Sequence, residues 1–125
     1  GNSGGALAIG VGDRFLMLEH AIFSVASPEA AASIVWKDTK HAPQAADALK
    51  LTAPDLLRLK LIDRIVPEPV GGAHGDPSGM ITNLRGALGE ELDRLVAVPT
   101  ADLVAARYAK YRRIGAWFDQ GGTTS

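Results

Sequence analysis

The 125-residue chain contains no cysteine, and neither sign of charge prevails in it. The first absence excludes disulfide bonds, thiolate metal ligands and a cysteine nucleophile, and it fits a reducing compartment. Lys and Arg number 13 against 14 Asp and Glu, which gives a net charge of −1, so the composition favours neither nucleic acid nor an anionic membrane as a partner. No apolar run approaches the ~20 residues of a membrane span. We therefore expect a cytoplasmic chain of about one domain's length.

The sequence also lacks the familiar sets of ionisable catalytic groups. It has no HExxH motif, no Walker loop and no carboxylate pair at helical spacing beside a histidine. Gly10 and Gly12 lack the third glycine and the preceding strand of a dinucleotide site. The three histidines, His20, His41 and His74, are too scattered to indicate a metal site. We therefore expect no resident metal.

A glycine turn, Gly1-Asn2-Ser3-Gly4-Gly5, opens the sequence and runs directly into the apolar stretch Ala6–Ile9. The pattern predicts a helix over residues 4–9 whose first N–H groups have no intrahelical partner. A ligand atom can approach glycine closely because it has no Cβ, and the helix dipole favours negative charge there. A developing oxyanion suits such a site. Since the sequence starts without Met inside this turn, we expect it to be the C-terminal piece of a longer polypeptide.

Caps and apolar runs predict the elements that follow. Ser27 and Pro28 mark a helix start, which predicts a helix that continues to Trp36. Two alanine-rich segments predict short helices, and three apolar runs are short enough to predict strands. The expected strands cover residues 14–19, 21–25 and 61–66, and the further short helices cover residues 42–49 and 52–59.

Two amphipathic helices are expected near the carboxyl end, because apolar residues recur there at spacings of three and four. The second of them starts at Pro99-Thr100, and a frayed tail over residues 121–125 follows it. The apolar face of the first consists of Ile81, Leu84, Leu88, Leu92 and Leu95, and that of the second of Val104, Tyr108, Tyr111 and Phe118.

The opening letters Gly-Asn-Ser-Gly-Gly-Ala-Leu resemble the nucleophile segment of HtrA-type, trypsin-fold serine proteases, with Ser3 as the nucleophile. That chemistry needs a histidine base and a carboxylate, which precede the serine in that fold. A trypsin-like barrel would continue as alternating strands, whereas this sequence continues as capped helices. The protease is the weaker of two interpretations.

A longer, collinear resemblance points to another family. Segments of this sequence occur in the order found in the α subunit of bacterial acetyl-CoA carboxylase carboxyltransferase; they are Ser3–Asp13, Ser24-Val25, Ser27–Glu29, Ala32–Ile34, Trp36-Lys37, Ala42-Pro43, Leu59–Asp63, Pro67–Pro69 and Gly71–His74. The likeness is dense to about residue 80 and looser beyond it. Asn2 departs from the pattern, since many relatives have glycine there; a backbone site tolerates Asn if its φ is compatible.

The resemblance implies an α/β fold of the ClpP/crotonase type, a spiral of strand-strand-helix units. It implies a carboxyl transfer from carboxybiotin to acetyl-CoA, giving malonyl-CoA for fatty acid synthesis. The paired glycines of the family fall on Gly4 and Gly5, whose backbone N–H groups would form the oxyanion hole for the ureido oxygen of biotin. Biotin itself is implied to act as the base, so the family needs no ionisable side chain here. Residues 1–75 would end the crotonase-like core, 76–120 would form a helical extension, and 121–125 a disordered tail.

The same resemblance implies the partners. They are a carboxyltransferase β subunit, the biotin carboxyl carrier protein that bears the biotin, biotin carboxylase and acetyl-CoA or malonyl-CoA, in an assembly of two α and two β chains. His74 lies in the loop that belongs to the resemblance and is expected to be structural rather than catalytic. The basic run Arg107, Lys110, Arg112 and Arg113 fits either a solvated face or docking on an acidic patch of the β subunit.

Two further interpretations stay open. The first is a crotonase-fold hydratase or isomerase, another acyl-CoA enzyme, which would need a glutamate base such as Glu19 or Glu29. The second is a non-catalytic piece whose helices complete the core of a partner.

Overall fold

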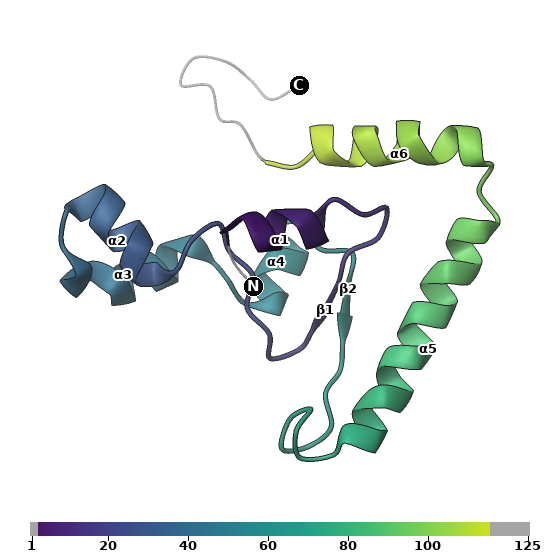
Figure 1. Cartoon of the computed structure of the whole chain (residues 1–125), viewed down its shortest axis with the longest axis horizontal. Coiled ribbons are helices and arrows are strands. Elements are labelled where there is room, and N and C mark those ends of the chain that lie inside the picture. Colours follow the sequence, from purple (N-terminus) through teal and green to yellow (C-terminus); the bar gives the residue numbers. More distant parts are fainter. Residues whose placement is uncertain (1–2, 116–125) are drawn as a thin grey trace.

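The computed structural model describes residues 3–115, and its elements form a small mixed α/β arrangement (Figure 1). Helix α1 lies near the centre, the α2–α3 pair extends to one side, and the long helices α5 and α6 run along two outer edges. The elements are α1 (Ser3–Gly10), β1 (Leu16–Leu18), α2 (Pro28–Trp36), the 3₁₀ turn η1 (Thr39–His41), α3 (Ala42–Leu49), α4 (Ala53–Arg58), β2 (Arg64–Val66), α5 (Pro77–Val96) and α6 (Thr100–Arg112).

Strands β1 and β2 pair in parallel, with Met17 opposite Ile65. Parallel strands need a long crossover, which the helices α2, α3 and α4 provide here. The sequence predicted both strands correctly but as longer elements. The predicted strand at residues 21–25 is wrong, since the segment contains isolated bridge residues, including Ile22 in an antiparallel bridge with Thr52, and no strand. The N–H of Phe23 donates to the carbonyl of Leu51, so this segment follows the α3–α4 connection and does not extend the sheet.

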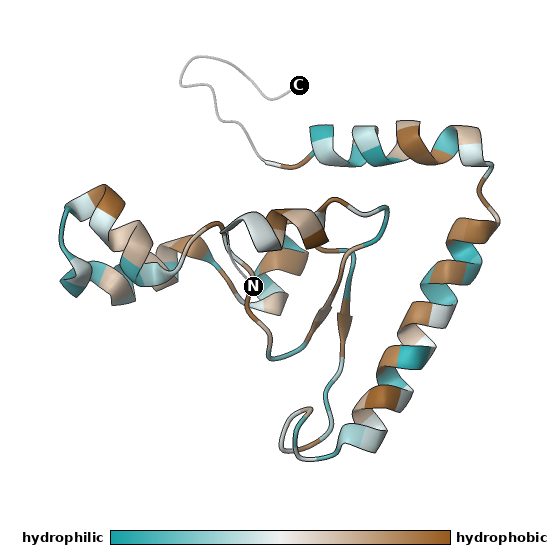
Figure 2. Ribbon diagram, in the orientation of Figure 1, coloured by the Kyte–Doolittle hydropathy of each residue, from teal (hydrophilic) through white to brown (hydrophobic). Residues whose placement is uncertain are grey.

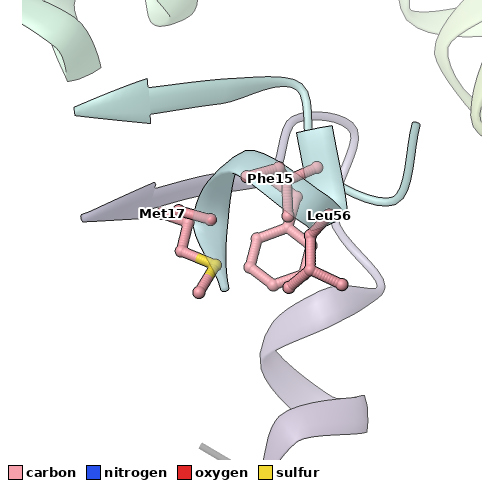
Figure 3. Close-up of a cluster of buried hydrophobic side chains, with 5 residues drawn as sticks. Phe15, Met17 and Leu56 are labelled. Atoms are coloured by element: carbon pink, nitrogen blue, oxygen red, sulfur yellow. The ribbon is translucent and has the colours of Figure 1, made fainter. Parts of the chain in front are cut away.

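The first hydrophobic core lies between β1 and α4. Its central residues are Phe15, Met17 and Leu56, which gather beneath the strand pair (Figure 3). Phe23 packs edge-on against Phe15, with ring centroids 4.7 Å apart at 75°, a favoured geometry for aromatic pairs. Ile62 completes the cluster at the start of the β2 segment. This core fixes β1, and therefore the turn that joins it to α1.

The second core joins α5 to β2 through Val66, Met80 and Ala87. Leu84 packs against this cluster, whereas Leu88 on the neighbouring face is exposed. The single apolar face predicted for this helix is therefore wrong, because Leu84 and Leu95 turn inward and Ile81, Leu88 and Leu92 turn outward. Figure 2 shows apolar residues at intervals along the whole of α5.

Two helix starts are fixed by the caps that the sequence contains. The hydroxyl of Ser27 accepts the N–H of Ala30 at 3.2 Å, with Pro28 in the first turn, as predicted. At α5, a carboxylate oxygen of Asp76 accepts the N–H of Gly79 at 2.9 Å. Within residues 3–115, no helix combines the length and the apolar character that a membrane crossing requires.

Candidate functional site

The amino end of α1 presents backbone donors that have no partner in the part of the chain that the structure describes. The N–H of Ser3 is used, because it donates to the carbonyl of Val25 at 3.1 Å. The N–H groups of Gly4 and Gly5 belong to the first helical turn, and within residues 3–115 no group accepts from them. Both glycines are exposed. The structure therefore places the two predicted site residues at an open helix start, where donors face outward along the axis.

Internal structure does not explain why these two positions are glycine. Neither Gly4 nor Gly5 has the positive φ that favours glycine. A Cβ added at either position would meet no described atom within 4 Å. Glycine costs about 1 kcal/mol per residue in a helix relative to alanine. The described contacts of α1 therefore leave open space beside the main chain at both glycines.

Ser3 has a left-handed backbone, with φ at 58°, which is uncommon for a residue with a Cβ. A nucleophilic serine would need a histidine base within hydrogen-bond reach. His20 contacts Glu68, and His41 stacks on Trp36 with ring centroids 5.5 Å apart. His74 lies beside Gly72. In the described part of the chain, no contact joins any of these histidines to Ser3.

Side chains of α6 bind the carboxyl end of α1 and the turn after it. The hydroxyl of Tyr111 reaches two carbonyl oxygens there, that of Gly10 and, at 3.0 Å, that of Gly12. The neighbouring Lys110 Nζ lies 3.3 Å from the carbonyl oxygen of Asp13 and 2.5 Å from Asp63 Oδ2. Residues about 100 positions apart in sequence therefore meet at the turn that follows α1.

Two cations of the basic run take part in these contacts. Lys110 pairs with Asp63, and Arg107 lies 3.6 Å from Asp13 Oδ2. Both cations therefore pair with carboxylates of this chain, and their side chains are 17% exposed for Lys110 and 37% exposed for Arg107. Arg112 and Arg113 are exposed, as an open face requires. On the same helix, Val104 and Tyr108 are exposed while Tyr111 turns inward, so the predicted apolar face is also wrong; Phe118 lies outside the described residues.

A buried carboxylate, Glu91, ties α5 to the rest of the molecule. Its side chain is only 4% exposed, and it contacts Arg14 at 2.6 Å and Arg94 at 2.7 Å, with Arg64 at 3.6 Å. The hydrogen bond from Arg14 and the surrounding positive charge hold the pKa of Glu91 below its usual range. The sequence analysis missed this residue. The signal that could have revealed it is its position four residues after Ala87, which places this acid on the buried face of α5.

Glu68 organises the loop at the carboxyl ends of the two strands. Its carboxylate accepts the N–H of His20 at 2.9 Å and that of Ala73 at 2.8 Å, and these bonds lower the pKa of Glu68. Gly71 and Gly72 turn the loop with φ of 91° and 86°. The open hollow beside them has a volume of about 760 Å³ and includes His20, Glu68 and Gly72.

The remaining sequence candidates do not join the glycine site. Glu19 accepts the N–H of Glu68, and Glu29 lies in the first turn of α2. Within residues 3–115, no three His, Asp or Glu side chains gather closely enough to hold a metal ion. The backbone donors of Gly4 and Gly5 thus remain the candidate site, without an ionisable group assigned to it.

Comparison with known proteins identifies relatives of one kind. A family described as "Acetyl co-enzyme A carboxylase carboxyltransferase-like" matches residues 1–115. Proteins called acetyl-coenzyme A carboxylase carboxyl transferase subunit alpha are 62% identical in Heliobacterium modesticaldum, 57% in Thermosynechococcus vestitus and 54% in Thermus thermophilus. These matches cover 92%, 92% and 94% of this chain but 34%, 36% and 38% of the relatives. The chain thus spans about a third of the length of the curated relatives it matches.

Proposed function

We propose that this chain, which belongs to the acetyl-CoA carboxylase carboxyltransferase-like family, supplies the biotin-binding part of a carboxyltransferase active site. Carboxybiotin, borne by a carrier protein, supplies the carboxyl group that converts acetyl-CoA to malonyl-CoA, and negative charge develops on its ureido oxygen as the carboxyl group leaves. The task of this chain is to hold that oxygen. The N–H groups of Gly4 and Gly5 donate to it.

The observation that carries the proposal is the open start of α1. Two exposed N–H groups lie there without a described partner, and no Cβ stands between them and an incoming ring. Donors fixed in a helix need no reorganisation when charge develops, which is why such holes stabilise oxyanions. The positive end of the helix dipole adds to the effect. A neutral ureido group and its charged form would both fit, but the charged form would be held more strongly.

The surroundings of α1 support a site shared with another polypeptide. Leu7, Ile9 and Val11 are all exposed, close in sequence to the glycines. Exposed apolar residues are available for burial against another protein segment. We assign this surface to contact with a carboxyltransferase β subunit, which supplies the thioester half of the site. An assembly of two α and two β chains in the cytoplasm, served by biotin carboxylase and the carrier protein, completes the proposal.

The finer fold assignment belongs to the same proposal. We place residues 1–75 in the C-terminal part of a crotonase-like spiral and residues 76–120 in a helical extension. The parallel β1–β2 pair with its helical crossover fits a strand-and-helix spiral, and the extension starts where Asp76 caps α5.

The test is Gly5→Val in the full-length α subunit that contains this segment, reconstituted with the β subunit. A side chain at this position meets nothing in the described structure, so folding and assembly are retained while the ring's approach is blocked. Biotin-dependent decarboxylation of malonyl-CoA should fall at least about a hundredfold, as on loss of an oxyanion-hole donor.

The matched control is Gly89→Val on α5, where an added Cβ also meets nothing. It should retain wild-type turnover. Full activity in the Gly5 variant would remove this glycine from the site, and an equal loss in both variants would show that the effect is not local.

A further inference from the structure

Helix α1 is held by its ends rather than by packing. Of its described residues only Ala6 is buried, while Leu7 and Ile9 are exposed. At the amino end, the Ser3 N–H bond to Val25 is the fixed point. The last carbonyls of any helix also lack intrahelical partners. What binds them therefore decides how the helix axis is aimed.

Tyr111 binds them. Its hydroxyl lies within hydrogen-bond reach of the carbonyl oxygens of Gly10, the last residue of α1, and Gly12, in the turn that follows. Gly10 is half-buried, and a Cβ there would be in ordinary contact with the Phe23 ring at 3.4 Å. The phenol therefore holds the backbone at the point where α1 meets the residues around Phe23.

The helix that carries Tyr111 is itself anchored to the sheet. Lys110 pairs with Asp63 at 2.5 Å. Asp63 in turn accepts the N–H of Phe15 at 2.6 Å through its side chain and donates its own N–H to the carbonyl of Phe15 at 2.8 Å. Through these bonds the carboxyl-terminal part of α6 is joined to the turn between α1 and β1, while the helix runs along an outer edge of the molecule in Figure 1.

We infer that Tyr111 is a positioning residue for the oxyanion site at Gly4 and Gly5, an inference that rests on the function proposed above. An eight-residue helix is about 12 Å long. A displacement of about 2 Å at its carboxyl end, with the amino end fixed at Val25, tilts the axis by about 10°. Because the first-turn N–H groups point along that axis, the tilt turns both donors away from the oxygen. Productive sites hold their groups within about 10–20°, so a tilt of this size reaches the lower limit of that range and should lower the rate without abolishing it.

The experiment compares Tyr111→Phe with Tyr108→Phe in the full-length α subunit reconstituted with the β subunit. Tyr108 lies one turn earlier on the same helix, is 67% exposed, and its hydroxyl has no partner among residues 3–115. Both variants lose one hydroxyl and nothing else. Tyr111→Phe should lower kcat/KM for free biotin by about tenfold, less than the hundredfold that a 1 Å misplacement can cost. KM for malonyl-CoA should stay unchanged, and Tyr108→Phe should match wild type.

A second measurement does not depend on catalysis. Hydrogen exchange of the α1 amides should accelerate by about two- to tenfold in Tyr111→Phe, the effect of one lost hydrogen bond, while α5 amides exchange as before. Wild-type values in both assays would overturn the inference, and so would equal losses for biotin and malonyl-CoA, which indicate general loosening. The proposed function fails separately: if Gly5→Val keeps full activity, the site is elsewhere, and the exchange data alone then decide whether Tyr111 fixes α1.

Discussion

Replacing Glu91 with glutamine should weaken the attachment of α5 more than any surface change on that helix. The substitution keeps the size of the side chain but removes its charge, and it turns one acceptor atom into an amide donor that faces guanidinium groups. Arg14 and Arg94 each lose a charge-assisted hydrogen bond, and Arg64 loses a nearby anion. The unpaired guanidinium groups then have to find water.

The magnitude follows from how the carboxylate is covered. A hydrogen bond to a charged group contributes about 1.5–3 kcal/mol, and removing one partner of a deeply buried ion pair costs about 3–5 kcal/mol. Here the arginines that cover Glu91 are themselves 29–61% exposed, so water screens the interaction. We therefore expect the free energy of unfolding to fall by about 2 kcal/mol. With an m-value of about 2 kcal/mol/M, the urea midpoint falls by about 1 M.

The assay is urea unfolding of the purified protein, followed by circular dichroism at 222 nm because α5 and α6 supply much of the helix. Glu90→Gln is the matched control: Glu90 is the preceding residue, is 58% exposed, and pairs at 2.6 Å with Arg64 alone. An exposed pair contributes about 0–1 kcal/mol. If the two variants unfold within about 0.5 kcal/mol of each other, the carboxylate of Glu91 does not hold α5 and the argument fails.

The pH dependence of stability is an independent test of the role assigned to the Glu91 carboxylate. The folded pKa of Glu91 is lowered, so its contribution to stability is present above the unfolded pKa of about 4.3 and is lost as pH falls through the folded value. The difference in stability between wild type and Glu91→Gln should therefore shrink on acidification. A difference that grows on acidification would contradict the assignment.

Two further predictions concern the loop after β2 and the second core. In Glu68→Gln, the N–H groups of His20 and Ala73 lose a charged acceptor, so their hydrogen exchange at pH 7 should accelerate. Because the folded pKa of Glu68 is lowered, the exchange rates of the wild type should approach those of the variant as pH falls below about 4.3. Unchanged exchange would refute the role of Glu68. Val66→Ala should lower the free energy of unfolding by about 2 kcal/mol, because Val66 is fully buried between β2 and α5. Val96→Ala, at an exposed position, should change it by no more than about 0.5 kcal/mol. Equal effects of the two substitutions in urea unfolding would contradict the second core.

Elements with local signals were predictable from the sequence. Helix α2 follows from Ser27 and Pro28, whose capping chemistry acts within one turn. The apolar run at residues 21–25 has the same local character as the run that forms β1, yet it forms no strand. Whether a short run pairs depends on its neighbour, here Leu51, about 30 residues away. Sequence periodicity carries no information about that neighbour.

The long helices show a second limit. The predicted apolar face of α5 was based on large apolar residues alone, and it combined residues from an inner and an outer face. The buried face also contains the small Ala87 and the ion-paired Glu91, which such a pattern does not include. A charged residue is expected outside unless its partners are known, and those partners lie on other elements. The contacts of Lys110 and Tyr111 with the α1–β1 turn were equally out of reach, since nothing in the basic run distinguishes Lys110 from Arg112.

The helix that follows the glycine turn was predictable because its signals are local, whereas the site proposed at its start stays a prediction. A side-chain acid or base has to be tuned toward neutrality. The pKa values of Glu68 and Glu91 are instead lowered, which keeps both groups ionised at pH 7 and suits them to holding loops and helices in place. A site built from main-chain N–H groups needs no such tuning, only an accurate direction. If the proposed site at Gly4 and Gly5 is correct, the charged network around Asp63 and Glu91 and the phenol of Tyr111 serve it by fixing the elements that set its direction.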